Sequence, residues 1–357
     1  MTTYTTKVLK TVLSALHYSG VDALVAPYTR GAGIVFMLHH VTPVPVGAFD
    51  PNRILRVTPT FLDSVIGQVL AAGFDVLSLD DAHDRLKTIS RDRPPARPFA
   101  CFTFDDGYKD NLIHAYPVFK RRNLPFTVYV PTDYPSGDGD LWWLALERVV
   151  REAPAMVVQM QGKLRTFQCH TAAEKDQAFH DIYWWLRSIP EDRARQVVQD
   201  LVSGIGFKSR SLCTDLIMTW DEIRLLASDP LVTIGAHTKR HFALAKLPTN
   251  VVQDEIFGSV ARLEQELDRK IRHFSFPYGD ETSCGEREYK LAADAGMATA
   301  VTTRKGMIHS HHATELTALP RVSLNGDYQD ARYVKVFLNG TPFALWNMLR
   351  GTRIRPA

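Results

Sequence analysis

Two adjacent carboxylates, Asp105 and Asp106, end an apolar run at residues 102–108, whose sequence is FTFDDGY. The β-prone residues before them predict a strand, and Gly107 predicts the turn that ends it. Two carboxylates so close together repel each other, so the pKa of one rises unless a cation lies between them. The pair therefore indicates a metal site in which one aspartate binds the ion and the other is free to act as a base.

Two histidines offer the remaining ligands. His237 and His241 lie in LVTIGAHTKRH, at and just after the end of an apolar run. In a helical turn this spacing puts both imidazoles on one face. Two neutral imidazoles and a carboxylate make a three-ligand site with an open position, which suits zinc, cobalt, nickel or iron. Taken alone, such a pair is more often an ordinary surface pair, and only the acidic pair at another strand end favours the metal site.

The elements that must hold these groups recur along the chain as buried-strand candidates, each followed by a helical stretch. We predict strands at residues 33–38, 74–79, 99–104, 125–130, 231–237, 273–279, 297–303 and 316–324. Apolar strands that alternate with helices indicate a parallel sheet covered on both faces, and seven or eight such units close into a barrel. The active site of a barrel enzyme lies at the C-terminal strand ends, where the reactive clusters of this sequence fall.

One region departs from this alternation of strands and helices. Residues 134–218 are helical in character and rich in Trp, Arg and Glu, which predicts a helical insertion between two barrel strands. We interpret its tryptophans as packing anchors, with a sugar-stacking platform beside the cleft as the alternative: Trp142, Trp143, Trp184 and Trp185.

Three motifs together resemble those of the polysaccharide deacetylase family, whose members share the NodB-type catalytic domain: TFDDGY at 103–108, HTKRH at 237–241 and SFPYG at 275–279. The resemblance implies a distorted (β/α)7–8 barrel and the metal-dependent removal of N-acetyl groups from glycans. It divides the chain into an N-terminal helical segment (1–32), the barrel (33–133 and 219–325), the helical insertion (134–218) and a C-terminal tail (326–357).

The resemblance also implies roles for single residues. Asp106, His237 and His241 would hold a divalent metal, zinc in the first place, with cobalt, nickel or manganese as alternatives. Asp105 would be the general base that activates the attacking water. Tyr278 lies where a backbone N–H helps to stabilise the oxyanion.

The chain departs from the commonest family pattern at Ser275, which stands where most members carry the arginine that orients the base. Arg321, at another predicted strand end, is the candidate replacement, and a surface arginine is the alternative interpretation. Thr103 is expected to support the site from behind the ligands.

A closer resemblance to the poly-N-acetylglucosamine deacetylases indicates the general acid. In those enzymes the histidine that acts as general acid lies at the first strand. The segment FMLHHV at 36–41 places His39 at that position, with His40 beside it. His39 is therefore the predicted acid that protonates the leaving amine. The alternative is that both histidines merely end a core strand. The late histidines are expected in a polar loop: His309, His311 and His312.

Composition limits the class of protein. The chain has 357 residues, 45% hydrophobic and 23% charged, which are globular proportions. A net charge of +3 is too mild to imply nucleic-acid binding. Four scattered cysteines without a CxxC pair predict reduced thiols. A helix is predicted from Lys7 to His17, with Gly20 as its stop, and neither a membrane span nor a signal peptide is predicted.

We therefore expect a cytoplasmic hydrolase of carbohydrate metabolism that removes N-acetyl groups from a sugar, a polysaccharide or a precursor of a cell-surface exopolysaccharide. Peripheral membrane association and a lipid-linked glycan substrate stay open, and the tail arginines Arg350, Arg353 and Arg355 form either a solvated end or a contact with an anionic lipid or glycan carrier. An amidohydrolase or O-deacetylase of small acylated molecules and an inactive glycan-binding relative are the alternatives. The sequence predicts no oligomeric state.

Overall fold

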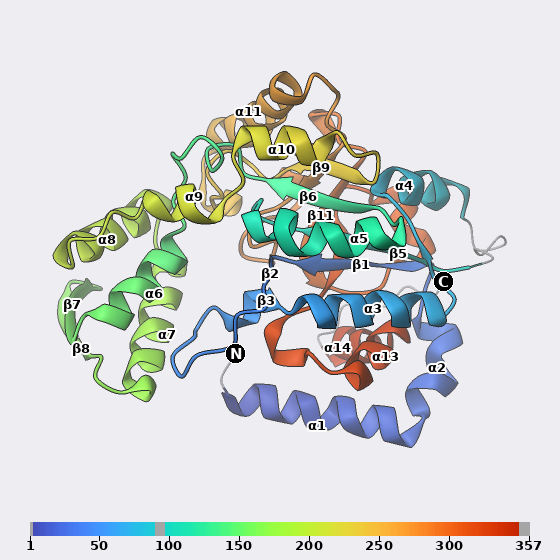
Figure 1. Cartoon of the computed structure of the whole chain (residues 1–357), viewed down its shortest axis with the longest axis horizontal. Helices are drawn as coiled ribbons and strands as arrows, with labels where there is room; N and C mark the ends of the chain where they lie inside the picture. Colours follow the sequence, from blue (N-terminus) through green and yellow to red (C-terminus); the bar gives the residue numbers. More distant parts are fainter. Residues whose placement is uncertain (1–2, 90–96, 350–357) are drawn as a thin grey trace.

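The computed structural model of the chain describes residues 3–89 and 97–349 (Figure 1). Seven parallel strands close into a barrel, because β1 pairs with both β12 and β5. Around the barrel the order is β1 (Gly33–Leu38), β12 (Leu319–Ser323), β11 (Thr299–Lys305), β10 (His273–Ser275), β9 (Val232–Ala236), β6 (Phe126–Val130) and β5 (Phe99–Phe104). The predicted (β/α) barrel is confirmed, and the number of closing strands is seven.

The predicted strand at residues 74–79 does not belong to the closed barrel. Only β4 (Asp75–Val76) forms there, and it extends the sheet beyond β5 without joining the closed barrel. A separate sheet of two strands, β2 (His40–Val41) and β3 (Arg56–Val57), lies next to the end of β1. The sequence did not predict this sheet.

Helices cover the outside of the barrel, and several begin with the caps that their sequences provide. Thr219 and Glu222 form a capping box at the start of α10, which satisfies the first backbone N–H groups of that helix. The covering helices are α3 (Pro59–Ala71), α5 (Tyr116–Arg122), α10 (Trp220–Ala227), α11 (Thr249–Leu267) and α12 (Glu286–Asp294). Helix α4 (Leu79–Thr88) instead packs its buried residues Leu79, Ala82 and Leu86 on the cluster of the barrel interior. Short turns are η1 (Arg53–Leu55), the π-helical η2 (Asn111–Ala115), η3 (Leu244–Lys246), η4 (Ser310–Thr314) and η5 (Gly326–Tyr328).

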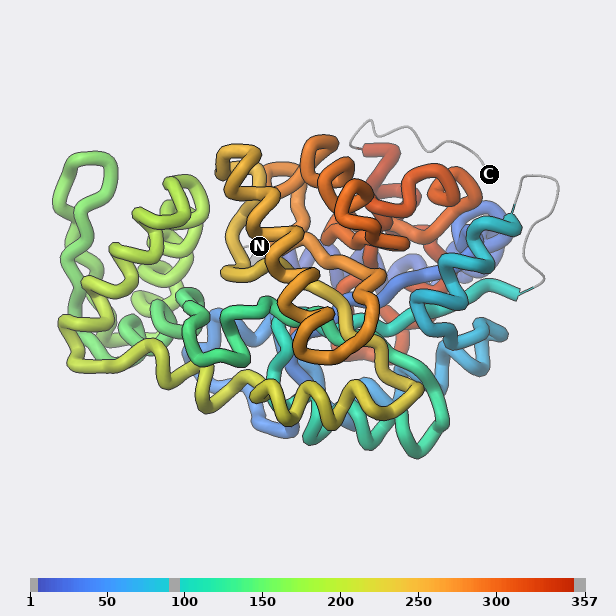
Figure 2. Tube along the Cα trace, turned by 90° about the horizontal axis from the view of Figure 1, so that it is seen from above, coloured from blue at the N-terminus to red at the C-terminus, as the bar shows by residue number. Residues whose placement is uncertain are grey.

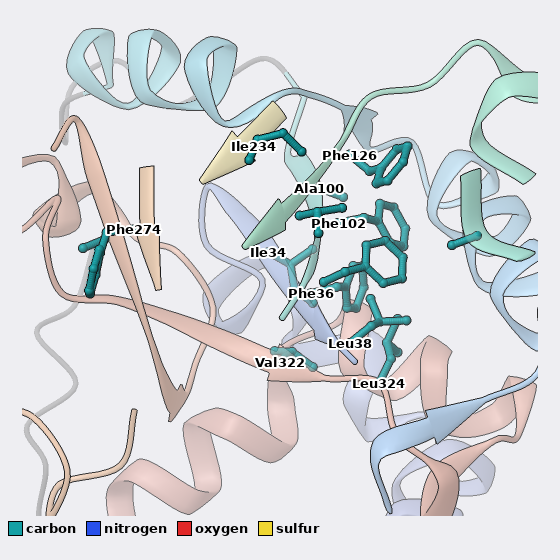
Figure 3. Packing of buried hydrophobic residues seen from close by; sticks show 14 of the residues in the cluster. Ile34, Phe36, Leu38, Ala100, Phe102, Phe126, Ile234, Phe274, Val322 and Leu324 are labelled. Carbon is teal, nitrogen blue, oxygen red and sulfur yellow. The ribbon is translucent and has the colours of Figure 1, made fainter. Parts of the chain in front are cut away.

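Alternate side chains of the strands face two different environments. Phe36 of β1 and Phe102 of β5 pack with the apolar face of α3, so this set points outward to the helices (Figure 3). Val35 and Cys101, the residues just before them, belong to a smaller separate cluster with Tyr129, which fills the barrel interior. The same alternation continues past Cys101, so the side chains at 103 and 105 also point into the barrel.

The segment between β6 and α10 protrudes from one end of the barrel (Figure 2) and has a hydrophobic core of its own. It comprises α6 (Trp142–Glu152), β7 (Ala155–Met160), β8 (Lys163–Gln168), α7 (Ala172–Ser188), α8 (Glu191–Gly204) and α9 (Ser211–Leu216). The antiparallel β7–β8 hairpin was not predicted, because this stretch was interpreted as helical. Its turn residues, Gln161 and Gly162, have φ values of 52° and 79°, as a tight two-residue hairpin requires.

Both ends of the described chain form helices that pack together beside the barrel. The predicted N-terminal helix lies within α1 (Thr3–Ser19), and Gly20 ends it with a φ of 69° before α2 (Val21–Thr29). The segment predicted as a tail forms α13 (Ala331–Leu338) and α14 (Thr341–Leu349), which contact α1 and α2. The three tail arginines lie outside the described residues. Within 3–89 and 97–349, no helix combines the length and hydrophobicity that a bilayer crossing requires.

Candidate active site

The candidate catalytic residues come from different strands, whose carboxyl ends bring them together. Asp105 and Asp106 follow β5 directly, and His237 follows β9 directly. Ser275 is the last residue of β10, and Arg321 lies within β12. Because the strands are parallel, these groups meet at one rim of the barrel, where barrel enzymes place their active sites.

Asp106, His237 and His241 form a compact set of metal-ligand atoms, all within 4.8 Å of one another. The Nε2 atoms of His237 and His241 lie 3.5 Å and 3.3 Å from Oδ1 of Asp106. Ligand atoms bound tetrahedrally to zinc at roughly 2.1 Å lie about 3.4 Å apart, so the observed spacing fits such an ion. Oδ1 of Asp106 is buried and has no hydrogen-bond partner within the described part of the chain, as expected of an atom that completes its shell with a cation.

The backbone and the neighbouring groups orient these ligands. Nδ1 of His237 lies 2.6 Å from the carbonyl oxygen of Ser275, which can only accept a hydrogen bond, so Nε2 keeps its lone pair for a ligand. Asp106, Thr238 and His241 have left-handed φ values of 75°, 65° and 58°. Each such residue costs about 1–3 kcal/mol and typically persists only where the surroundings hold it, as at active sites.

Burial and nearby charges set the protonation states of the ligands. Burial lowers the pKa of His241 to about 3, so its imidazole is neutral at neutral pH. Burial opposes the ionisation of Asp106, but the charge interaction with His241 and the contact with His237 outweigh it, and the pKa of Asp106 is lowered. An ionised carboxylate beside a neutral imidazole is the state that metal binding requires.

Arg321 binds Asp105 with both terminal nitrogens inside the barrel. Nη1 donates to Oδ1 at 2.8 Å, and Nη2 donates to Oδ2 at 2.6 Å. Nη1 also donates to the Thr103 hydroxyl at 3.1 Å, Nη2 to the Ser275 hydroxyl at 3.0 Å, and Nε to the Thr302 carbonyl at 2.9 Å. The five N–H groups of the guanidinium therefore have five partners, which a buried Arg321, 1% exposed, needs.

This network shows how the chain keeps an arginine on Asp105 although position 275 carries a serine. The small Ser275 side chain both leaves room for the guanidinium from β12 and accepts a hydrogen bond from it. The alternative of a surface arginine at position 321 is wrong, since Arg321 is buried. Burial opposes the ionisation of Asp105, but the charge of Arg321 and its hydrogen bonds outweigh it and lower the pKa of Asp105.

His39 lies just after β1, at the same rim. Burial lowers the pKa of His39, whereas the carboxylates of Asp106 and Asp105 favour its protonated form. Asn111, in the π-helical turn η2, donates from its side chain to the His39 carbonyl at 2.7 Å and so holds the backbone at this point. Asn111 was not among the predicted site residues, because the motif gives no signal for it.

The other histidines near these motifs are engaged elsewhere. Nδ1 of His40 lies 2.7 Å from Oδ2 of Asp110, and its ring stacks on Tyr108 with centroids 3.5 Å apart. Of the late histidines predicted in a loop, His311 and His312 lie in the 3₁₀ turn η4, and His309 directly precedes it. His309 packs against Gly31, before the first residue of β1, so this cluster lies at the opposite end of the barrel from the candidate site.

Tyr278 has a left-handed φ of 62°, and contacts from the inserted segment hold its side chain. The Trp142 indole N–H donates to the Tyr278 hydroxyl at 2.8 Å, and the Arg187 guanidinium carbon lies 3.6 Å from the ring centroid. On the main chain, the Thr303 hydroxyl donates to the Tyr278 carbonyl at 2.6 Å. A strained backbone is thus stabilised from both sides.

The inserted segment also contacts His241, one of the two candidate metal-ligand histidines. The rings of Trp143 and His241 lie 5.2 Å apart, and Nη2 of Arg195 donates to the His241 carbonyl at 3.5 Å. Trp142 and Trp143 are buried, as packing anchors are, whereas Trp184 is 52% exposed. The sequence gave no signal for the arginines of this segment, because their partners lie far away along the chain.

The family model described as polysaccharide deacetylase matches residues 92–300, which is more than half of the chain. The chain belongs to the polysaccharide deacetylase family. It is therefore an enzyme of the deacetylase class, as the motifs predicted. No curated protein matches the chain.

Solved structures of deacetylases share its fold. The Streptococcus pyogenes deacetylase PplD in complex with acetate is 17% identical with a TM-score of 0.53, over 82% of this chain and 92% of that one. IcaB from Ammonifex degensii is 16% identical with a TM-score of 0.50, over 85% and 98%. A de-N-acetylase from Aggregatibacter actinomycetemcomitans is 14% identical with a TM-score of 0.53, over 85% and 99%. At these identities the likeness shows a common fold.

Proposed function

We propose that this polysaccharide deacetylase is a metal-dependent hydrolase that removes N-acetyl groups from an N-acetylated glycan of cell-surface polysaccharide metabolism. The observation that carries the proposal is the buried Asp105, which Arg321 binds with two hydrogen bonds directly beside the three-ligand set. A metal-binding module needs no second carboxylate fixed there. Hydrolysis of an amide does, because a base must take the proton of the attacking water.

Asp106, His237 and His241 would hold a divalent ion, with zinc as the first candidate, because a carboxylate and two imidazoles suit it. Cobalt, nickel and manganese remain candidates, since these ligands do not select strongly among them. When bound, such an ion polarises the acetyl carbonyl and makes water a stronger nucleophile at neutral pH.

The chain's own residues supply the proton transfers. Asp105 accepts a proton from the attacking water, while Arg321 keeps the carboxylate ionised and fixed. As the carbonyl oxygen gains charge, the backbone N–H of Tyr278 donates a hydrogen bond to it. His39 then donates a proton to the departing nitrogen, so that the C–N bond breaks and acetate and a free amine leave.

Several observations support a glycan amide as the substrate. The family match indicates a polysaccharide, and one structural neighbour is named a de-N-acetylase. A precursor or lipid-linked form of the glycan, and a cytoplasmic location, stay predictions. The inactive alternative loses its main argument, because Arg321 fills the place of the absent motif arginine.

Acetate release tests the proposal. Purified protein is freed of metal with a chelator, reloaded with zinc, cobalt, nickel or manganese, and offered N-acetylated oligosaccharides, their O-acetylated counterparts and lipid-linked N-acetyl sugars. We expect metal-dependent release of acetate together with free amine. Release of acetate with free hydroxyl only would assign an O-deacetylase, and no release with any metal would favour the inactive glycan-binding alternative.

A further inference from the structure

A large share of the exposed apolar side chains gathers on the helices at the two ends of the chain. Of nineteen exposed large hydrophobic residues in the described part, nine lie on α1, α2 and α14. They are Val8, Val12 and Tyr18 on α1, Val21, Leu24 and Tyr28 on α2, and Leu345, Met348 and Leu349 on α14. We call these nine residues the terminal apolar surface.

Helix α2 shows the pattern most clearly. Asp22 and Ala26, four residues apart, are buried, whereas Leu24 and Tyr28 on the opposite face are 77% and 85% exposed. The one acidic residue of the helix therefore points inward, where its carboxylate accepts a hydrogen bond from Asn339 at 2.8 Å. The outer face of α2 is apolar and carries no charge.

The three helices lie next to one another. α2 packs against both α1 and α14, and the Thr29 hydroxyl at the end of α2 donates to the Asn339 carbonyl just before α14. In Figure 1, α1 and α2 lie on the outside of the molecule, away from the segment that holds α6, α7 and α8. The terminal apolar surface thus belongs to one region of the fold.

Positive charge is concentrated in the same two stretches of sequence. Residues 1–30 and 331–357 contain eight lysine and arginine residues and one acidic residue, Asp22, a net charge of +7. The whole chain has a net charge of +3, so residues 31–330 carry −4. Three of these cations, Arg350, Arg353 and Arg355, lie outside the described residues, and Arg332 is paired with Asp330, just before α13, at 2.6 Å. Lys7 and Lys335 are exposed on α1 and α13, while Asp22 is buried. Apolar side chains flanked by an excess of cations are the combination that binds an anionic bilayer surface.

We propose that the terminal apolar surface docks the enzyme on an anionic lipid bilayer, with Leu24 and Tyr28 entering the interface and the flanking lysines binding lipid headgroups. A second copy of this chain is a poorer occupant. A two-fold interface on this surface would bring two sets of cations together, while Asp330 is already paired with Arg332 and Asp22 is buried. Docking on a bilayer also fits a lipid-linked glycan as the substrate of the proposed deacetylase.

Vesicle co-sedimentation tests the docking without any measurement of activity, so its failure is distinct from failure of the proposed function. The full chain is mixed with phosphatidylcholine vesicles, with or without phosphatidylglycerol, at two salt concentrations. The variants are Leu24→Glu/Tyr28→Glu, Lys7→Ala and the matched control Val157→Glu/Leu164→Glu. Val157 and Leu164 are 57% and 74% exposed on the β7–β8 hairpin, so the control adds the same two negative charges on another surface. Circular dichroism melting checks that each variant folds.

We expect the wild type to bind vesicles with phosphatidylglycerol more tightly than neutral ones, and salt to weaken this binding. Leu24→Glu/Tyr28→Glu should lower the partition coefficient about tenfold or more, and Lys7→Ala about fivefold. Val157→Glu/Leu164→Glu should leave it unchanged. Equal binding to both kinds of vesicle, or an equal loss in the control, would overturn the proposal. So would a dimer in analytical ultracentrifugation that Leu24→Glu/Tyr28→Glu converts to a monomer, which would assign the surface to a second copy.

Discussion

Replacing Arg321 with lysine tests how the catalytic base is held. Lysine keeps the positive charge but has three N–H groups on one nitrogen, so it can replace at most three of the five hydrogen bonds of Arg321. Losing two charge-assisted bonds in a buried site should lower the free energy of unfolding by about 3–6 kcal/mol. A carboxylate of Asp105 displaced by about 1 Å should lower kcat roughly 10²-fold.

The assay combines urea unfolding, acetate-release kinetics and calorimetric metal titration of the same preparations. Ser275→Ala is the matched control, because it removes one acceptor of Arg321 and leaves both bonds to Asp105. It should cost about 1 kcal/mol of unfolding free energy and less than about tenfold in kcat. Metal affinity should stay within a few-fold of wild type in both variants. If Arg321→Lys loses stability but keeps the wild-type kcat, the arginine supports only the fold and the reasoning is refuted.

Three further predictions concern the surroundings of the site and the stability of the barrel. Trp142→Phe removes the hydrogen bond to the Tyr278 hydroxyl, so kcat should fall about tenfold with little change in KM, and an equal change in both constants would contradict this. Gly279→Ala places a methyl group 2.5 Å from a backbone nitrogen at a φ of 60°, so urea unfolding should show a loss of at least about 1–2 kcal/mol, whereas wild-type stability would contradict the strain argument. The hydrogen bond from Lys120 lowers the pKa of Asp229 to about 2, so this carboxylate stabilises the fold above its unfolded pKa of about 3.9 and ceases to do so as the pH falls towards 2. The difference in Tm between wild type and Asp229→Asn should therefore be largest near neutral pH and shrink between pH 4 and 2, and a constant difference would contradict the assignment.

The barrel strands were predictable because their residues carry a local signal. Gly33–Leu38 and Phe99–Phe104 form β1 and β5 at the predicted bounds, since an uninterrupted β-prone run bounded by turn residues leaves little choice. The β7–β8 hairpin was missed for the opposite reason. Its strands are as long as β1 and β5, but β8 (KLRTFQ) has four polar residues of six. The Gln161–Gly162 turn was overlooked within a stretch whose neighbours are strongly helical.

The site also contains residues that the sequence could predict and contacts that it could not. Adjacent or closely spaced residues, such as Asp105 with Asp106 and His237 with His241, could be found because one motif contains both members. Contacts between distant segments could not, and the bond from Trp142 to Tyr278 joins residues 136 positions apart. Arg321 was predicted only as a candidate replacement for the absent motif arginine. The fold explains why it reaches Asp105: β12 lies beside β1, and the other neighbour of β1 is β5, which Asp105 directly follows.

The central claim is that Asp105 acts as the base beside a metal held by other residues. Asp105→Asn keeps the shape of the side chain but removes its basicity, and none of the three ligand atoms belongs to it. The decisive measurement is metal content and acetate release on the same preparation of this variant. We expect about one bound divalent ion per chain, as in wild type, with acetate release lowered by at least about 10²–10³-fold. Wild-type release from Asp105→Asn would contradict this claim.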